Sequence, residues 1–163
     1  MKHGLYLFLF ALIVFLAAAI GFFIINYNQP AEVLTFPEIK YIKIAGQDIR
    51  VELALNKEMQ EKGLSGRNSL IPGEGMLFVF EKPGRYPFWM KEMNFPIDII
   101  WLASFEDGGE KKIKVAHIEK NAIPESFPKT FGPDADSQYI LEVPAGFAEK
   151  NNLQIGDPAV FTY

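Results

Sequence analysis

Two acidic residues stand inside apolar stretches that are typical of β-strands. Asp98 lies in "PIDIIWLA" and Glu142 lies in "YILEV". An unpaired buried charge costs several kcal/mol, so each acid is expected either on a solvent face or buried beside a partner. Two carboxyl groups about 5–10 Å apart in a cleft could act as acid and base in a hydrolase. Arg67 and Lys91 are the available cations, and a buried Arg67–Asp98 pair would be structural.

The segment "PFWMKEMNFPID", residues 87–98, mixes bulky apolar and charged side chains. On a regular strand, alternate residues face opposite sides, so both of its faces would carry charges and large apolar groups. A ligand groove lined by aromatics and a few polar groups has this composition. A core strand that bends at a bulge has it as well, and the sequence leaves both readings open. The predicted ligand-binding residues are Arg67, Trp89, Lys91, Asp98 and Glu142.

Other chemistry has weaker support. Ser65 follows a predicted helix and lacks the Gly-x-Ser-x-Gly spacing of a nucleophile elbow. Met76, Met90 and Met93 could bind Cu(I) together with His117. A strand would not project Met90 and Met93 to the same side, so core packing is favoured. The chain has no Cys, which excludes thiol catalysis and thiolate metal sites. We therefore expect no metal or cofactor, assign no catalytic residue and leave enzymatic activity open.

Short alternating segments must position these residues. "EIKYIKIA" and "IRVELAL" flank "GQD", which predicts a β-hairpin. "NKEMQEKG" predicts a short helix with Asn56 as N-cap and Gly63 at its end. Further bulky β-rich segments follow, with a second short helix near residues 144–152 and an irregular loop over residues 120–137. The sequence predicts a β-rich α+β domain of about seven to nine mostly antiparallel strands and two short helices.

The first 25 residues differ from the rest. Residues 5–25 form an apolar run without any charge, long enough to span a bilayer as a helix. Lys2 precedes this run, and no Lys or Arg follows it before Lys40, which favours a cytoplasmic N-terminus and an outside domain. The alternative is a signal peptide cleaved near Ala19 and a secreted domain. The predicted organisation is a signal anchor at 1–25, a linker at 26–37 and one domain at 38–163.

The charge balance limits the partners. The chain carries 20 acidic and 16 basic residues, for a formal net charge of −4. Nucleic-acid binding requires a basic surface, which this composition does not indicate. The predicted partners are the membrane, through residues 5–25, and a small polar ligand or an envelope protein.

Four blocks, in order, resemble one known family. They are "EKGLSGRNSL", "GEGMLFVF", "FWMKEMNFPIDIIWL" and "YILEVPAGFAEKNNLQIGD", within about residues 38–161. In order and spacing they are similar to the domain of unknown function 192. The resemblance implies a small, mostly β domain, often behind a signal or membrane segment, and implies no established activity. One departure is Glu92, which stands where the family usually has Asn.

Together these features favour a membrane-anchored extracytoplasmic domain that binds a small polar ligand. An envelope sugar fits, because its apolar ring face can stack on Trp89 while charged groups bond to its hydroxyls. Two alternatives remain. One is a hydrolase that uses Asp98 and Glu142 as paired carboxylates. The other is an accessory domain that binds an envelope protein through an exposed apolar patch.

Overall fold

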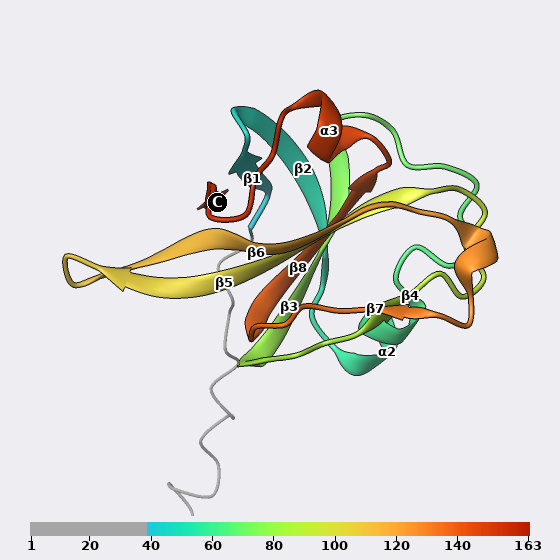
Figure 1. Ribbon diagram of the computed structural model, residues 1–163, viewed down its shortest axis with the longest axis horizontal. Coiled ribbons are helices and arrows are strands. Elements are labelled where there is room, and N and C mark those ends of the chain that lie inside the picture. Colours follow the sequence, from blue (N-terminus) through green and yellow to red (C-terminus); the bar gives the residue numbers. More distant parts are fainter. Residues whose placement is uncertain (1–38) are drawn as a thin grey trace, which may run out of the picture. The chain divides into compact units, whose positions relative to one another are not determined.

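The computed structural model describes residues 39–163, which form nine strands and two short α-helices. Seven strands close a barrel in the order β1-β2-β3-β8-β5-β6-β9 (Figure 1). Neighbouring strands are antiparallel except for the parallel pair β2–β3. The barrel strands are β1 (Tyr41–Ile44), β2 (Gln47–Ala54), β3 (Glu74–Gly84), β5 (Ile97–Asp107), β6 (Glu110–Ala122), β8 (Ser137–Pro144) and β9 (Pro158–Thr162). The predicted β-rich, mostly antiparallel domain with two short helices is confirmed.

Smaller elements connect and flank the barrel strands. The short strands β4 (Phe88–Trp89) and β7 (Thr130–Phe131) pair with each other and belong to no other sheet. Helix α2 (Lys57–Lys62) follows β2, and the 3-10 turn η1 (Pro124–Ser126) precedes β7. Helix α3 (Phe147–Lys150) follows β8.

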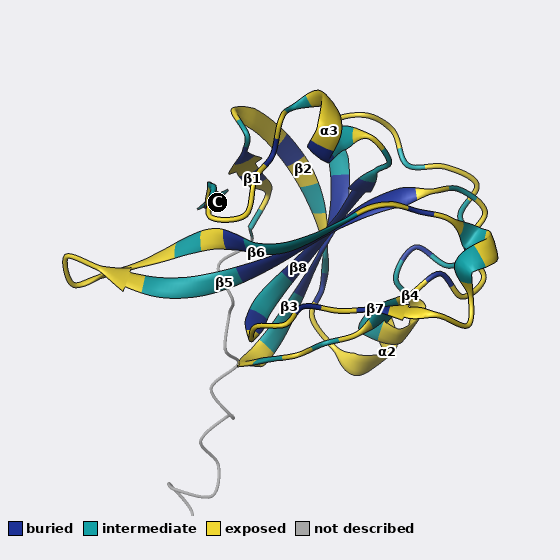
Figure 2. Ribbon diagram, viewed as in Figure 1, coloured by how far each residue is buried: buried dark blue, intermediate teal, exposed yellow. Residues whose placement is uncertain are grey.

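Two apolar clusters lie on opposite faces of the central strands β3, β8 and β5. The first cluster takes buried residues from all seven barrel strands, including Leu141 and Val143, and fills the barrel interior. The second contains Ile140 of β8, Ile99 of β5 and residues of the covering segments. Alternate residues of one strand face opposite sides, so β8 contributes to both clusters. Figure 2 shows the buried positions concentrated along these central strands.

Local sequence explains the turns that connect these strands. The β1–β2 hairpin turns at Ala45 and Gly46, with φ of 49° and 73°, and the β5–β6 hairpin turns at Gly108 and Gly109, with φ of 62° and 83°. Positive φ at both central residues is the type I′ geometry, one of the two favoured in two-residue hairpins. Asn56 caps helix α2 as predicted, because its side chain accepts a hydrogen bond of 2.9 Å from the backbone N–H of Met59.

The segment after Trp89 is a turn, which corrects the prediction of a longer strand. The backbone N–H of Met93 donates to the carbonyl of Met90 at 3.3 Å, and Glu92 has a φ of 55°. This turn brings Met90 and Met93 into the same apolar cluster. The expectation that the two methionines project to different sides was therefore wrong, since it assumed strand alternation. Their role in core packing agrees with the favoured interpretation.

The segment 120–137 is more ordered than the predicted loop. Strand β6 continues to Ala122, and β7 pairs with β4.

Within residues 39–163, no helix is long and apolar enough to cross a membrane. The predicted membrane helix at 5–25 and the linker at 26–37 lie outside the described residues.

Candidate functional site

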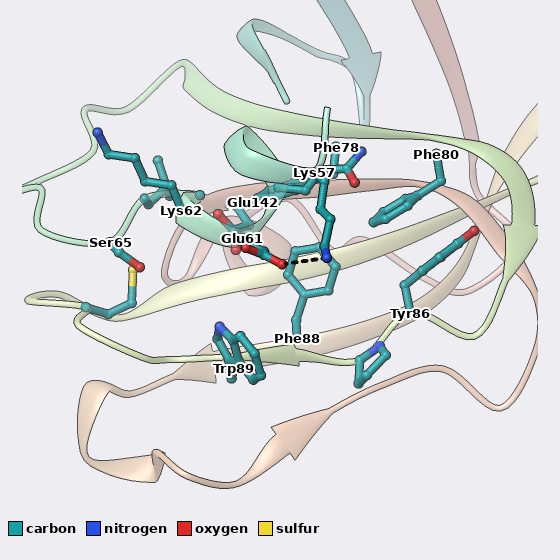
Figure 3. Close-up of a pocket in the computed structure, with 15 residues that line it drawn as sticks. Lys57, Glu61, Lys62, Ser65, Phe78, Phe80, Tyr86, Phe88, Trp89 and Glu142 are labelled. Carbon is teal, nitrogen blue, oxygen red and sulfur yellow. Dashed lines mark ion pairs between the residues drawn. The ribbon is translucent and has the colours of Figure 1, made fainter. Parts of the chain in front are cut away.

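A pocket opens on the outer face of the barrel, between helix α2 and the segment that contains β4 (Figure 3). Its volume is about 230 Å³. A cavity of about 150 Å³ is large enough to bind benzene, so this pocket has room for a ligand built on one six-membered ring. Five aromatic residues line it: Phe78, Phe80, Tyr86, Phe88 and Trp89.

Contacts between the aromatic rings hold the pocket walls in place. Phe80 and Tyr86 are stacked with ring centroids 3.6 Å apart, while Phe78 and Phe88 meet edge to face at 4.8 Å. The indole N–H of Trp101 donates to the carbonyl of Tyr86 at 2.9 Å and fixes the start of this wall. Four of the rings therefore keep a defined arrangement without a ligand. The fifth, Trp89, is 47% exposed and is free to contact a bound molecule.

Glu142 is the acidic residue at the inner end of the pocket. It lies in the middle of β8, opposite Met76 of β3 and Ile99 of β5, and only 4% of its surface is exposed. Its Oε2 atom is buried and has no hydrogen-bond partner among the described residues. Burial raises the pKa of Glu142 to about 8, and the nearby positive charge of Arg67 opposes part of this increase. At neutral pH the carboxyl group is therefore mostly protonated.

Gly63 keeps space above this carboxyl group. Its φ of 49° is in the left-handed region, which favours glycine at the end of helix α2. A Cβ atom at this position would lie 3.2 Å from Cζ of Phe78 and 3.9 Å from Oε2 of Glu142. Any larger side chain would therefore crowd the inner end of the pocket.

The other polar groups of the pocket are already engaged or lie at its mouth. The amide of Gln60 donates to the carbonyls of Ala54 and Val79, at 3.3 and 2.9 Å. The hydroxyl of Ser65 donates to the carbonyl of Lys91 at 2.8 Å. Lys57 and Glu61 form an ion pair of 3.6 Å, drawn as a dashed line in Figure 3, and Lys62 also lines the pocket. Glu142 is thus the buried acidic residue of this mostly apolar lining, and its Oε2 atom is unsatisfied.

The predicted ligand-binding residues lie in different places. Trp89 and Glu142 line the pocket, whereas Arg67, Lys91 and Asp98 do not. Arg67 forms an ion pair of 2.7 Å with Glu52 on strand β2, and the Arg67–Asp98 pair considered from the sequence does not form.

Asp98 is fully buried and has a structural role. Its carboxylate accepts hydrogen bonds from three backbone N–H groups, those of Asn121 at 2.8 Å, Gly146 at 3.2 Å and Ala148 at 2.8 Å. These bonds tie the end of β6 and the start of α3 to strand β5. Both of its oxygens are therefore occupied by the fold itself.

The strand register separates Asp98 from Glu142. Asp98 pairs with Val143, and its neighbour Ile99 pairs with Glu142. Directly paired residues project to the same side of a sheet, and consecutive residues project to opposite sides. The two carboxyl groups therefore lie on opposite faces of the barrel wall and cannot act on one substrate.

Sequence reasoning did not identify most of the aromatic lining. Phe78 and Phe80 are two residues apart in "MLFVF", so they share a strand face, and that spacing was an available signal. The position of Tyr86 and Phe88 opposite that face depends on a contact between strands and had no local signal. Residues 39–163 contain no group of three or more His, Asp or Glu side chains that could hold a metal ion.

Fold and pocket together define a small closed-barrel β domain with an aromatic pocket on its outer face. The chain belongs to the DUF192 family, described as Uncharacterized ACR, whose family model matches residues 40–161. No curated protein matches the chain.

Two solved structures share this fold. One is a protein of unknown function from Novosphingobium aromaticivorans DSM 12444, with 28% identity and a TM-score of 0.66, covering 75% of this chain and 84% of its own. The other is a protein from Sinorhizobium meliloti 1021 that is provisionally described as a transcription regulator. It has 30% identity and a TM-score of 0.64, and the match covers 74% of this chain and 90% of its own.

Proposed function

We propose that this domain binds a small ligand in the aromatic pocket. The observation that carries the proposal is the unpartnered Oε2 atom of Glu142 at the inner end of a preformed apolar pocket. A polar group buried without a hydrogen bond costs roughly 1–3 kcal/mol of stability. A ligand that bonds to this carboxyl group would recover that energy, whereas an apolar residue at this position would have avoided the loss.

The size and lining of the pocket favour a molecule with one ring. The rings of the wall offer flat apolar surface, and the exposed Trp89 can stack on the outer side of a ligand. A small polar ligand such as an envelope sugar has a suitable apolar ring face and hydrogen-bonding groups. We also propose, from the apolar run at 5–25, that the domain is anchored to the cell membrane and lies outside it.

The other functions have less support. The hydrolase with paired carboxylates needs Asp98 and Glu142 at one site, and the strand register separates them. Binding of an envelope protein through an exposed apolar patch would not use the buried carboxyl group of Glu142, which carries the proposal. Regulation of transcription, suggested for the Sinorhizobium meliloti protein, has no support in the net charge of −4.

Thermal unfolding of the full chain with a panel of envelope sugars and small ring compounds tests the proposal. A ligand at 100 times its dissociation constant should add about 2.7 kcal/mol of stability and raise the unfolding temperature. Trp89→Ala should weaken this shift, because it removes a pocket wall. Tyr41→Ala is the matched control, since Tyr41 is similarly exposed at 42% and does not line the pocket. A shift that survives unchanged in Trp89→Ala would contradict binding at this pocket.

A further inference from the structure

The surroundings of Glu142 indicate which chemical group a ligand should bring to it. The other charged residues that line the pocket are Lys57, Glu61 and Lys62 of α2, and the charge that acts on Glu142 is that of Arg67, in the segment after that helix. On the flanking strands the register partners of Glu142 are Met76 and Ile99, which carry no charge. The guanidinium of Arg67 is bound to Glu52 and does not line the pocket. No cation of the described residues therefore bonds to Oε2 of Glu142.

The chemistry of the pocket favours a positively charged donor at this position. An ionised carboxylate only accepts hydrogen bonds, and its strongest partners are charged N–H groups. The faces of aromatic rings also attract cations. The lysines at the mouth of the pocket repel a positively charged ligand only weakly. Lys57 is 90% exposed and paired with Glu61, and water screens charges at such positions.

We propose that the ligand is a small organic ammonium, with its NH₃⁺ group on Glu142 and a body of about one ring against the aromatic wall. This inference rests on the proposed function and specifies the ligand of the same pocket. Two sources share the required chemistry, a simple ring amine such as benzylamine and an amino sugar such as glucosamine. The amino sugar combines the ammonium group with a ring that can stack on Trp89.

Binding of an ammonium should release a proton. Burial raises the pKa of Glu142 to about 8, so the empty pocket at pH 7 holds mostly the neutral acid. The ammonium binds the carboxylate form, so the carboxyl proton leaves to the buffer and the ligand keeps its own charge. The apparent affinity scales with the fraction of protein that holds the carboxylate, so for benzylamine, whose ammonium stays charged in this range, it should rise about fivefold between pH 7 and pH 8. Glucosamine loses its own proton in the same range and should show a smaller rise. A neutral ligand that accepts a bond from the protonated acid would show the opposite trend.

Isothermal titration calorimetry on the full chain tests the proposal with two matched pairs, benzylamine against benzyl alcohol and glucosamine against glucose. The amine of at least one pair should bind about tenfold or more tightly than its neutral partner. Titrations at pH 7 in two buffers with different ionisation enthalpies should show release of about one proton for each amine bound. The pair with the larger difference in affinity between amine and neutral compound shows whether the pocket prefers a simple ring amine or an amino sugar.

Variants separate Glu142 from a general effect of negative charge. Glu142→Gln keeps the shape of the side chain, and it should lower the affinity for the amine to that for the neutral partner. Glu149→Gln on helix α3 removes the same charge from an exposed position outside the pocket and should leave binding unchanged. If Glu142→Gln does not fold, proton release and the rise in affinity with pH in the unchanged protein still decide the question.

The failure of this inference can be distinguished from the failure of the proposed function. Equal affinities within both pairs, without proton release, would overturn the ammonium assignment and leave a pocket for small neutral ligands. If neither these compounds nor any other compound of the thermal panel binds, the proposed function and the inference are both wrong.

Discussion

Asp98 and Glu142 are two buried carboxyl groups on neighbouring strands, and the fold treats them in opposite ways. Asp98 accepts three hydrogen bonds from backbone N–H groups, so its charge stabilises the connection between β5, β6 and α3. Glu142 has an oxygen without a partner and a pKa raised to about 8 by burial. Equal burial therefore does not indicate an equal role. The satisfied group belongs to the structure, and the unsatisfied group marks the place for a ligand.

The position of each acid on the barrel wall explains this difference. The side of β8 that carries Val143 faces the barrel interior, where the start of α3 supplies backbone donors to Asp98. The side that carries Glu142 faces the second apolar cluster, where side chains of phenylalanine and methionine supply none. A shift of one residue in the register of β8 would move Glu142 to the side that faces the barrel interior.

The largest expected effect is that of Asp98→Ala on stability. The substitution removes the acceptor of three buried N–H groups, and each hydrogen bond to a charged group contributes about 1.5–3 kcal/mol. We expect the free energy of unfolding to fall by about 6 kcal/mol, measured by urea denaturation. Asp136→Ala is the control, because its carboxylate is 64% exposed and lies 3.8 Å from Arg85. A loss below about 1 kcal/mol for Asp98→Ala would contradict its structural role.

The next largest expected effect is a dependence of the unfolding free energy on pH, caused by the titration of Glu142. Its pKa is about 8 in the folded protein and 4.5 as its ordinary value, so the folded state holds the proton more tightly. Stability is therefore full below pH 4.5 and falls as the pH rises through 8, by about 4–5 kcal/mol at about 1.4 kcal/mol per pKa unit. Glu142→Gln should remove this decline, so the variant should be more stable than the unchanged protein at pH 9.

Denaturant titrations of both proteins between pH 4 and pH 9 measure this prediction. The difference in unfolding free energy between Glu142→Gln and the unchanged protein should grow with pH. Glu149→Gln should follow the unchanged protein at every pH, because it neutralises an exposed acid. A difference that stays constant from pH 4 to pH 9 would mean that Glu142 titrates normally.

The sequence predicted much of the fold and part of the pocket, and the limits have physical causes. Alternation and capping are local, so the β1–β2 hairpin and the Asn56 cap of helix α2 were predictable. Glu142 and Trp89 stood out because a charge in an apolar strand and a Trp among charges are visible in one sequence. The anionic partner of Arg67 was not visible, because Glu52 lies on β2, 15 residues away, and meets Arg67 only in the folded chain.

Arg67→Gln should have the smallest effect on stability, and it tests whether a nearby positive charge influences the ionisation of Glu142. The Arg67–Glu52 pair is partly exposed, at 37% and 53% of the side chains, so its loss should lower the unfolding free energy by at most about 1 kcal/mol. Arg67 also attracts the ionised form of Glu142, and its removal should move the pKa of Glu142 further upward. The decline of stability should then extend to higher pH than in the unchanged protein.

The matched control for this prediction is Arg50→Gln. Arg50 forms an exposed ion pair of 3.6 Å with Glu74 and is not among the charges that influence Glu142. Both variants should lose a similar small amount of stability at pH 5, where Glu142 is protonated in both. Only Arg67→Gln should move the pH range in which the unfolding free energy declines. This is the decline that Glu142→Gln should remove. If both variants leave that profile unchanged, Arg67 does not act on Glu142, and burial alone sets the state of the carboxyl group.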